Sequence, residues 1–223
     1  MLDAITRKYF TLFCKSKGYL VVTIGFHREH AAELNNPLPT KPLIFMKPPS
    51  TFIQNGAAIE IPLGCQEVHH EIELGVVIGS TCQRVDKDKS MNHVGGYVLA
   101  LDMTARDFQS TLKSKGHPWE LAKCFDTSCP VSDFISKDVI SDPHNVDLIC
   151  KVNGQLRQND NTGKMITRIP DLISYISQYF TLEEGDVILT GTPAGVGPVK
   201  HGDVIEGEIP GIVHFKFPVI QRT

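Results

Sequence analysis

The chain has 223 residues, of which 41% are hydrophobic and 21% are charged, and its formal net charge is −3. This length suits one domain with a sizeable core, and the composition is ordinary for a soluble globular protein. The small negative charge gives no electrostatic reason to expect nucleic acid, and no stretch approaches the roughly 18 consecutive apolar residues of a membrane span. We therefore expect a small-molecule substrate, with no nucleic acid and no membrane partner.

The first 20 residues, MLDAITRKYFTLFCKSKGYL, mix apolar and basic side chains around a single acid, Asp3. This composition fits a mitochondrial presequence and a solvated N-terminal helix about equally well, so the choice stays open. We divide the chain into an N-terminal segment, residues 1–20, and a single domain, residues 21–223. The six cysteines form no C-x-x-C pair, which predicts reduced, mostly buried thiols rather than a disulfide scaffold or a thiolate zinc site.

Few segments of the domain predict helices. The first, HREHAAELNN at residues 27–36, is short and is halted by Pro37. The second, within residues 103–116, ends at Gly116, a residue typical of helix C-termini. The third, IPDLISYISQYF at residues 169–180, carries an apolar stripe at helical spacing.

Most of the remaining sequence predicts short strands separated by Gly and Pro. The candidates are EIELGVVIG (71–79), GGYVLALDMT (95–104), VDLICKVNGQLRQ (146–158) and GDVILTGTP (185–193). Within the third, Asn153-Gly154 marks a tight hairpin turn. The expected fold is therefore α+β and β-rich, with a few short helices and a mobile segment near residues 26–42.

Acidic residues stand where the predicted strands are otherwise apolar. Side chains alternate along a strand, so Glu71 and Glu73 face the same side, and Asp102 ends the row of Val98 and Ala100. Three such carboxylates suit Mg²⁺ or Mn²⁺, and Ca²⁺ less well, and would leave roughly half of an octahedral shell open for a ligand. Spacing alone leaves an alternative open, in which the E-x-E pair is exposed and Asp102 caps the following helix.

Three further patterns have both a functional and a structural interpretation. Lys123, in an apolar setting with Trp119, either stabilises an oxyanion or extends to solvent. Thr192, in LTGTPAGVGP, either offers its hydroxyl and N–H to an anion or belongs to an ordinary turn. His30 and Glu33 would share a helix face, as a general base with its orienting carboxylate or as part of a solvated helix.

The motifs, taken in order, make the sequence similar to a known family. The matching segments are FMKP around Lys47, EVHHEIELGVVIG, GGYVLALDMTARDFQ, GHPWELAKCFD, KVNGQLRQ and TLEEGDVILTGTPAGVGPV. They resemble the fumarylacetoacetate hydrolase (FAH) family, and most closely its small eukaryotic single-domain branch, from about residue 43 onward. The resemblance implies a mixed β-roll, a homodimer, a mobile N-terminal lid at about residues 26–42 and a divalent metal at the mouth of the roll.

The resemblance also implies roles for individual residues. These are metal ligands Glu71, Glu73 and Asp102; enolate or oxyanion stabilisation by Lys123 and Gln109; substrate contacts from Arg106, Lys47 and Thr192; and a water-activating lid pair, His30 and Glu33. One segment departs from the family pattern, because the chain reads IGFHREH where relatives have G-R-N-Y before the lid histidine. If the carboxylates serve a ligand rather than the core, Glu71→Ala or Asp102→Ala should remove activity and leave the fold intact.

The implied function is a Mg²⁺-dependent enzyme, with Mn²⁺ as the alternative ion, for 2-oxo acids that bear a second carbonyl. Oxaloacetate would undergo keto–enol tautomerisation and decarboxylation, and acylpyruvates would be hydrolysed to pyruvate and a carboxylate, through a metal-chelated enolate. The implied compartment is the mitochondrial matrix, with the cytosol left open. Two alternatives remain: an isomerase or hydrolase of dienoate intermediates from aromatic catabolism, and a catalytically impaired metal-binding scaffold, which the altered segment before His30 supports.

Overall fold

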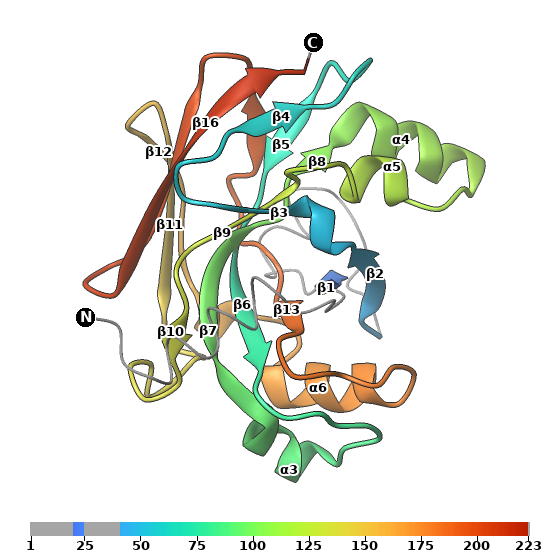
Figure 1. Cartoon of the computed structure of the whole chain (residues 1–223), viewed down its shortest axis with the longest axis vertical. Coiled ribbons are helices and arrows are strands. Elements are labelled where there is room, and N and C mark those ends of the chain that lie inside the picture. Colours follow the sequence, from blue (N-terminus) through green and yellow to red (C-terminus); the bar gives the residue numbers. More distant parts are fainter. Residues whose placement is uncertain (1–19, 25–40, 223) are drawn as a thin grey trace.

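The computed structural model describes residues 20–24 and 41–222. The predicted lid pair, His30 and Glu33, lies outside the described residues, as does most of the N-terminal segment. The described chain is rich in strands and carries a few short helices, as the sequence predicts (Figure 1). Within these residues, no helix combines the length and the apolar character needed to cross a bilayer.

The largest sheet has eight strands in the order β2-β1-β13-β6-β7-β9-β3, with β10 added against β7. Its strands are β1 (Leu20–Ile24), β2 (Leu43–Lys47), β3 (Phe52–Gln54), β6 (Ile72–Ile78), β7 (Val94–Leu101), β9 (Cys129–Val131), β10 (Ile135–Ser136) and β13 (Val187–Leu189). The sheet is mixed, because β1 is parallel to β13 and β3 is parallel to β9, whereas the central pair β6 and β7 is antiparallel.

Two smaller sheets complete the roll. The five-stranded sheet has the order β12-β11-β15-β16-β4, and the three-stranded sheet has the order β14-β5-β8. Their strands are β4 (Ile59–Ile61), β5 (Val68–His70), β8 (Thr104–Ala105), β11 (Asp147–Val152), β12 (Gln155–Asn161), β14 (Gly197–Val199), β15 (Val204–Ile209) and β16 (Val213–Gln221). The predicted hairpin joins β11 and β12, with positive φ angles at Asn153 (52°) and Gly154 (77°) as such a turn requires.

The main core lies between the largest sheet and the five-stranded sheet. Ile72, Leu74 and Val76 project from one face of β6, and Leu148 and Phe215 approach from β11 and β16; all five are buried in one cluster. β-Branched and aromatic residues dominate these strands because they pack well on a pleated surface. The opposite face of β6 and β7 forms a second, smaller cluster that includes Val77, Val98 and Ala100.

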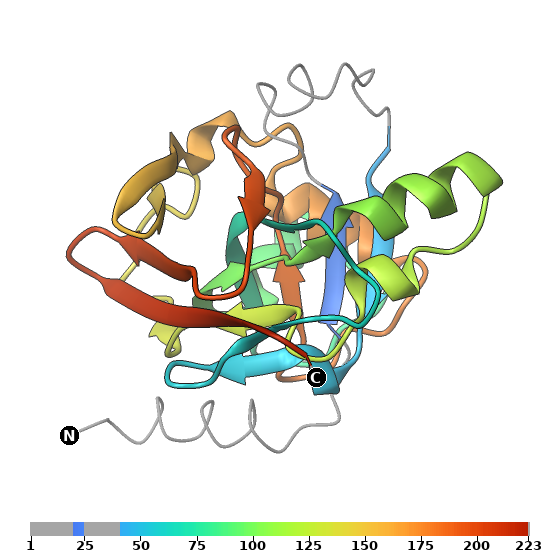
Figure 2. The ribbon, with the colours of Figure 1, turned by 90° about the horizontal axis from the view of Figure 1, so that it is seen from above.

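The helices cover the edges of this framework (Figure 1). They are α3 (Lys87–Ser90), α4 (Arg106–Lys115), α5 (Glu120–Lys123) and α6 (Ile169–Ser177), with single 3-10 turns at Pro49–Thr51, Met91–His93 and Thr162–Lys164. Helix α4 ends as predicted, with Gly116 in the left-handed conformation at φ 66°. The stripe on α6 is buried from Ile169 to Ile176, but the helix ends at Ser177 and Phe180 is 36% exposed. Figure 2 shows α4 and α5 together at the side of the molecule where β2 lies.

The cysteines that the structure describes are free. They are Cys65, Cys82, Cys124, Cys129 and Cys150, and only Cys124 is partly exposed. The prediction of reduced and mostly buried thiols is therefore confirmed for residues 41–222. Burial also raises the pKa of Cys150 to about 12, so this thiol stays protonated and unreactive at neutral pH.

Candidate active site

The central strands bring the three predicted carboxylates together. Glu73 on β6 lies opposite Ala100 on β7, and the backbone N–H of Asp102 donates a 2.9 Å hydrogen bond to the carbonyl of Glu71. One ligand oxygen from each side chain lies within 4.8 Å of the others. All three residues are buried, which excludes the alternative of an exposed E-x-E pair. The alternation of side chains along the strands therefore brings the three carboxylates together, as the sequence pattern predicts.

Lys123 reaches this cluster from the end of α5. Its ammonium donates hydrogen bonds to Glu71 Oε2 at 3.0 Å, Asp102 Oδ2 at 2.6 Å and Thr104 Oγ1 at 2.6 Å. The side chain is buried, so Lys123 does not extend to solvent. Burial by itself lowers the pKa of Lys123, but the charges of Asp102 and Glu71 outweigh it and the pKa is raised. Lys123 is therefore a fixed cation and hydrogen-bond donor, not a base.

Helix α4 adds a guanidinium at the partly exposed side of the cluster. Arg106 Nη2 donates to Glu71 Oε1, and Arg106 Nη1 donates to Gln109 Oε1 at 2.8 Å. These two residues are three apart on α4 and so share one helix face. Gln109 is the buried residue of this helix. With its oxygen held by Arg106, the Gln109 amide N–H₂ is the group that it can offer to a ligand.

Lys47, the last residue of β2, lies behind the carboxylates with none of its surface exposed. Its ammonium lies 3.0 Å from Asp102 Oδ1 and donates to Ser128 at 3.0 Å (carbonyl) and 2.9 Å (hydroxyl). It also donates to the carbonyl of Lys123. Lys47 therefore holds Asp102 and the end of α5 in place, and protein acceptors already surround its charge.

Glu73 has different partners from the other two carboxylates. Its Oε2 accepts a 2.5 Å hydrogen bond from the backbone N–H of Gly191. Gly191 has a φ of 97°, a conformation that favours glycine, and this turn directs the N–H at the carboxylate. Burial, followed by the charges of Asp102 and Glu71, raises the pKa of Glu73 well above its usual range, although Gly191 and Lys123 oppose the shift. An additional cation near Glu73 would relieve this cost.

Thr192 follows Gly191 but directs its hydroxyl into the protein. The hydroxyl donates to the carbonyl of Ile72 at 2.8 Å and accepts from Gln158 Nε2 at 2.8 Å. The Gln158 amide also donates to Pro193 O, and its oxygen accepts from Ile72 N and lies 2.9 Å from His70 Nδ1. Gln158 therefore ties the Gly191–Pro193 turn to the start of β6.

The donor set fits a divalent cation. Three buried carboxylates are the oxygen ligands that hard cations prefer. Asp102 Oδ1 accepts no well-aligned hydrogen bond within residues 41–222, even though Lys47 Nζ is 3.0 Å away. The formal charges of the three carboxylates and of Lys47, Arg106 and Lys123 cancel. A divalent cation would therefore give the site a charge of +2, which suits a doubly negative ligand.

Comparison with known proteins agrees with this geometry. A family model described as the C-terminal part of fumarylacetoacetate (FAA) hydrolase matches residues 20–220. The chain belongs to the fumarylacetoacetate hydrolase family. The family expectation for the fold, a mixed and strand-rich roll with few short helices, is therefore confirmed.

Several relatives carry the names of oxaloacetate and fumarylpyruvate enzymes. The chain is 50% identical to the mitochondrial oxaloacetate decarboxylase of Dictyostelium discoideum over 208 residues, which cover 92% of this chain and 95% of that protein. It is 49% identical to the mitochondrial oxaloacetate tautomerase FAHD1 of Homo sapiens over 203 residues, covering 91% and 92%. A solved fumarylpyruvate hydrolase from Pseudomonas aeruginosa, in complex with Mn²⁺ and pyruvate, superposes with a TM-score of 0.86 at 31% identity, covering 92% and 90%.

Sequence reasoning missed several residues that support this site. Thr104 and Ser128 hold the two lysines, Gly191 binds Glu73, and Gln158 anchors the turn before Pro193. The KVNGQLRQ motif contains Gln158, but its pattern predicts only a hairpin and no contact of Gln158. Ser128 has no pattern of its own, because its partner Lys47 is 81 residues away in the chain.

Proposed function

We propose that the protein is a metal-dependent enzyme for 2-oxo acids with a second carbonyl. It interconverts the enol and keto forms of oxaloacetate, decarboxylates oxaloacetate, and hydrolyses acylpyruvates to pyruvate and a carboxylate. The observation that carries the proposal is the buried carboxylate cluster bridged by Lys123. The oxaloacetate names of relatives at about half identity support it, as does the fumarylpyruvate hydrolase bound to Mn²⁺ and pyruvate.

Glu71, Glu73 and Asp102 would hold the metal in this proposal, and we favour Mg²⁺, with Mn²⁺ as the alternative. When bound, a divalent cation supplies Lewis-acid polarisation of the keto and carboxylate oxygens of the substrate. The preference for an oxygen-only ligand set supports a hard cation rather than zinc. The compartment names of the relatives support a mitochondrial location, and the family resemblance supports a homodimer.

Lys123 and Gln109 would stabilise the negative charge that develops on the substrate oxygen. The Lys123 ammonium already has three acceptors, so a substrate oxygen has to replace one of them. A fixed donor of this kind contributes about 3 kcal/mol to catalysis because it is oriented before the charge develops. Since the pKa of Lys123 is raised, it remains a donor throughout the neutral range.

The three reactions differ in what else they need. Tautomerisation requires only the movement of a proton between C3 and the enol oxygen, and decarboxylation breaks the C3–C4 bond of the same electron-rich unit. Hydrolysis needs an activated water as well, and His30 with Glu33 is the predicted base for that step. Replacing His30 should therefore reduce acylpyruvate hydrolysis more than oxaloacetate tautomerisation.

Arg106 is best placed among the three proposed substrate contacts, because it is partly exposed beside Glu71. Lys47 and Thr192 have their polar groups engaged within the protein. We propose that Lys47 acts through Asp102, and that Thr192 contributes its backbone N–H while its hydroxyl fixes the turn. In these roles Lys47 and Thr192 are both needed for activity, although neither side chain contacts the substrate.

The decisive experiment measures metal-dependent turnover in purified protein stripped of metal. The enol form of oxaloacetate is followed by its ultraviolet absorbance, and pyruvate release is assayed separately. We expect activity to return with Mg²⁺ or Mn²⁺ and to be lost in Glu71→Gln. Glu67→Gln is the matched control, since Glu67 lies four residues earlier and its half-exposed carboxylate contacts His69 instead. Full turnover without a divalent metal, or in Glu71→Gln, would refute the proposal.

A further inference from the structure

A pocket of about 570 Å³ lies between β2 and the connection from α4 to α5. This volume is within the usual range for small-molecule sites. The residues that line it are Leu43, Ile44, Phe45, Lys113, Gly116, His117, Pro118, Trp119 and Glu120. No residue that lines this pocket has a role in the active site described above.

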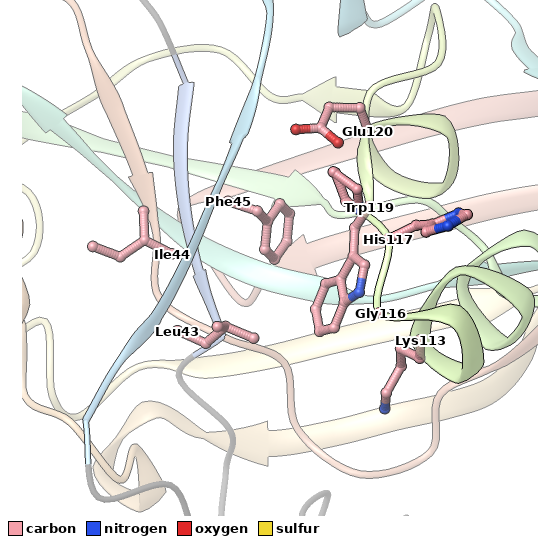
Figure 3. A pocket seen from close by; sticks show the side chains of 9 residues that line it. Leu43, Ile44, Phe45, Lys113, Gly116, His117, Trp119 and Glu120 are labelled. Atoms are coloured by element: carbon pink, nitrogen blue, oxygen red, sulfur yellow. The ribbon is translucent and has the colours of Figure 1, made fainter.

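Two aromatic rings dominate the pocket. Phe45 and Trp119 lie next to one another in its lining, with ring centroids 6.2 Å apart and planes inclined by 53° (Figure 3). Leu43 lies on the same face of β2 as Phe45, because strand side chains alternate, whereas Ile44 packs against the main core. This part of the lining is therefore aromatic and apolar, a surface that favours a flat, unsaturated group.

Phe45 links the pocket to the carboxylate cluster, because it lines the pocket and its ring also lies next to Lys123. Lys123 Nζ lies 5.0 Å from the centroid of the Phe45 ring, so one side chain separates the ammonium from the pocket. Trp119 immediately precedes α5, and its carbonyl accepts the backbone N–H groups of Ala122 and Lys123 at 2.9 and 3.0 Å. The same short helix therefore positions the indole and the ammonium.

The charges at the pocket do not select for a charged occupant. Lys113 Nζ lies 5.8 Å from the centroid of the Trp119 ring, on the α4 side, and Glu120 provides a carboxylate on the α5 side (Figure 3). The formal charges of Lys113 and Glu120 cancel. The shape and the apolar character of the aromatic side chains therefore determine which ligand group the pocket accepts.

We propose that this pocket receives the acyl group of an acylpyruvate and favours flat acyl groups that are aromatic or conjugated. This inference rests on the proposed function, in which the 2-oxo acid end of the substrate lies at the carboxylate cluster. The substituent beyond the second carbonyl then extends past Lys123 toward Phe45 and Trp119. Oxaloacetate has no such substituent, so its turnover is independent of the pocket.

The test uses 2-oxo acids that cannot be hydrolysed, so that binding is measured apart from turnover. 2-Oxo-4-phenylbutanoate carries a phenyl group where an aromatic acylpyruvate carries it, and 2-oxopentanoate carries only a methyl group. Calorimetric titration with Mg²⁺ present should give an affinity about tenfold higher for the phenyl compound. Trp119→Ala should abolish this ratio, and Trp119→Phe should keep most of it.

Leu121→Ala is the matched control, because Leu121 belongs to α5, is 70% exposed and does not line the pocket. It should keep the wild-type ratio, and both Leu121→Ala and Trp119→Ala should keep oxaloacetate turnover within about twofold of the wild type. The pocket proposal is overturned by a wild-type ratio near one, by a ratio that survives Trp119→Ala, or by equal loss of oxaloacetate turnover. Failure of acylpyruvate hydrolysis alone would instead refute that part of the proposed function, since the affinity ratio needs no catalysis.

Discussion

The two faces of strand β6 have opposite chemistry within seven residues. Ile72, Leu74 and Val76 point into the main core and are completely buried. On the other face Glu73 is equally well buried but carries a carboxylate, beside Glu71 at the entry to the strand. The two faces are therefore buried to the same extent. They differ in the interactions that offset the cost of burying their side chains.

The apolar face is stabilised by burial alone, which is favourable at about 25 cal/mol per Å². The acidic face is stabilised by specific partners, because a buried carboxylate without a cation or a donor is costly. Lys123, Arg106 and Lys47 supply those cations from three separate elements. The apolar face therefore tolerates any well-packed apolar side chain, whereas the acidic face depends on individual charges.

The largest effect should come from Asp102→Ala. The change leaves the ammonium groups of Lys47 and Lys123, both buried, without a shared carboxylate. We expect the free energy of unfolding of the metal-free protein to fall by about 3–5 kcal/mol, together with loss of metal binding. From these contacts we expect alanine here to destabilise the fold as well as to remove activity. Denaturant titration measures it, and the double variant Asp102→Leu, Lys47→Met should recover part of the loss. A change below about 1 kcal/mol would contradict the ion-pair account.

Leu74→Ala tests the opposite face of the same strand. Leu74 is fully buried in the core cluster, so its truncation should lower the free energy of unfolding by about 3 kcal/mol. Its side chain points away from the carboxylates, and the affinity for Mn²⁺ measured by calorimetry should stay within about twofold. If metal affinity falls along with stability, the two faces are not independent.

Glu73→Gln should separate function from stability. Loss of a ligand carboxylate should weaken metal binding by at least about 100-fold, more than loss of a supporting residue would. Because the folded-state pKa of Glu73 is raised above its unfolded value, its ionisation costs stability as pH rises through that folded pKa. The metal-free variant should therefore unfold at a higher temperature than the wild type at pH 8, with a smaller difference at pH 4. A wild type that is the more stable at pH 8 would contradict this sign.

Thr104→Val should have the smallest effect. The hydroxyl of Thr104 accepts from Lys123 and donates to the carbonyl of Asp102 at 3.1 Å. Its loss should lower kcat for oxaloacetate tautomerisation about tenfold, with KM nearly unchanged, because the Lys123 ammonium is then held less firmly in the orientation that the transition state needs. Thr111→Val on the exposed side of α4 is the control and should behave like the wild type. A rise in KM without a change in kcat would mean that Thr104 serves substrate binding instead.

Sequence periodicity predicted the face that Glu71 and Glu73 share, and the apolar row that ends at Asp102, because alternation is a local property of strands. It also predicted the end of α4 at Gly116, where only a residue that accepts positive φ fits easily. The end of α6 was predicted too late, since Phe180 continues the apolar pattern but lies past the last helical turn. The spacing of apolar residues does not mark a helix end as a cap does.

The partners of the predicted residues could not be read locally. Spacing alone left Lys123 undecided between stabilising an oxyanion and extending to solvent, and Lys47 was expected to contact substrate. The structure buries both ammonium groups against Asp102, with Ser128 and Thr104 as further acceptors. Such contacts depend on which strands become neighbours, so no pattern within a window of ten or twenty residues contains them.

The sequence was enough to predict the main strands, the alternation that gathers the acids on one face and, through its motifs, the family. The cations that neutralise those acids, and the pocket that Phe45 and Trp119 line near Lys123, became visible only in the folded chain. The reason is physical: backbone sterics and side-chain alternation act between residues that are near in sequence. Charge compensation and cavities arise instead where distant segments meet, and their geometry is set by which strands pair and how the sheets pack.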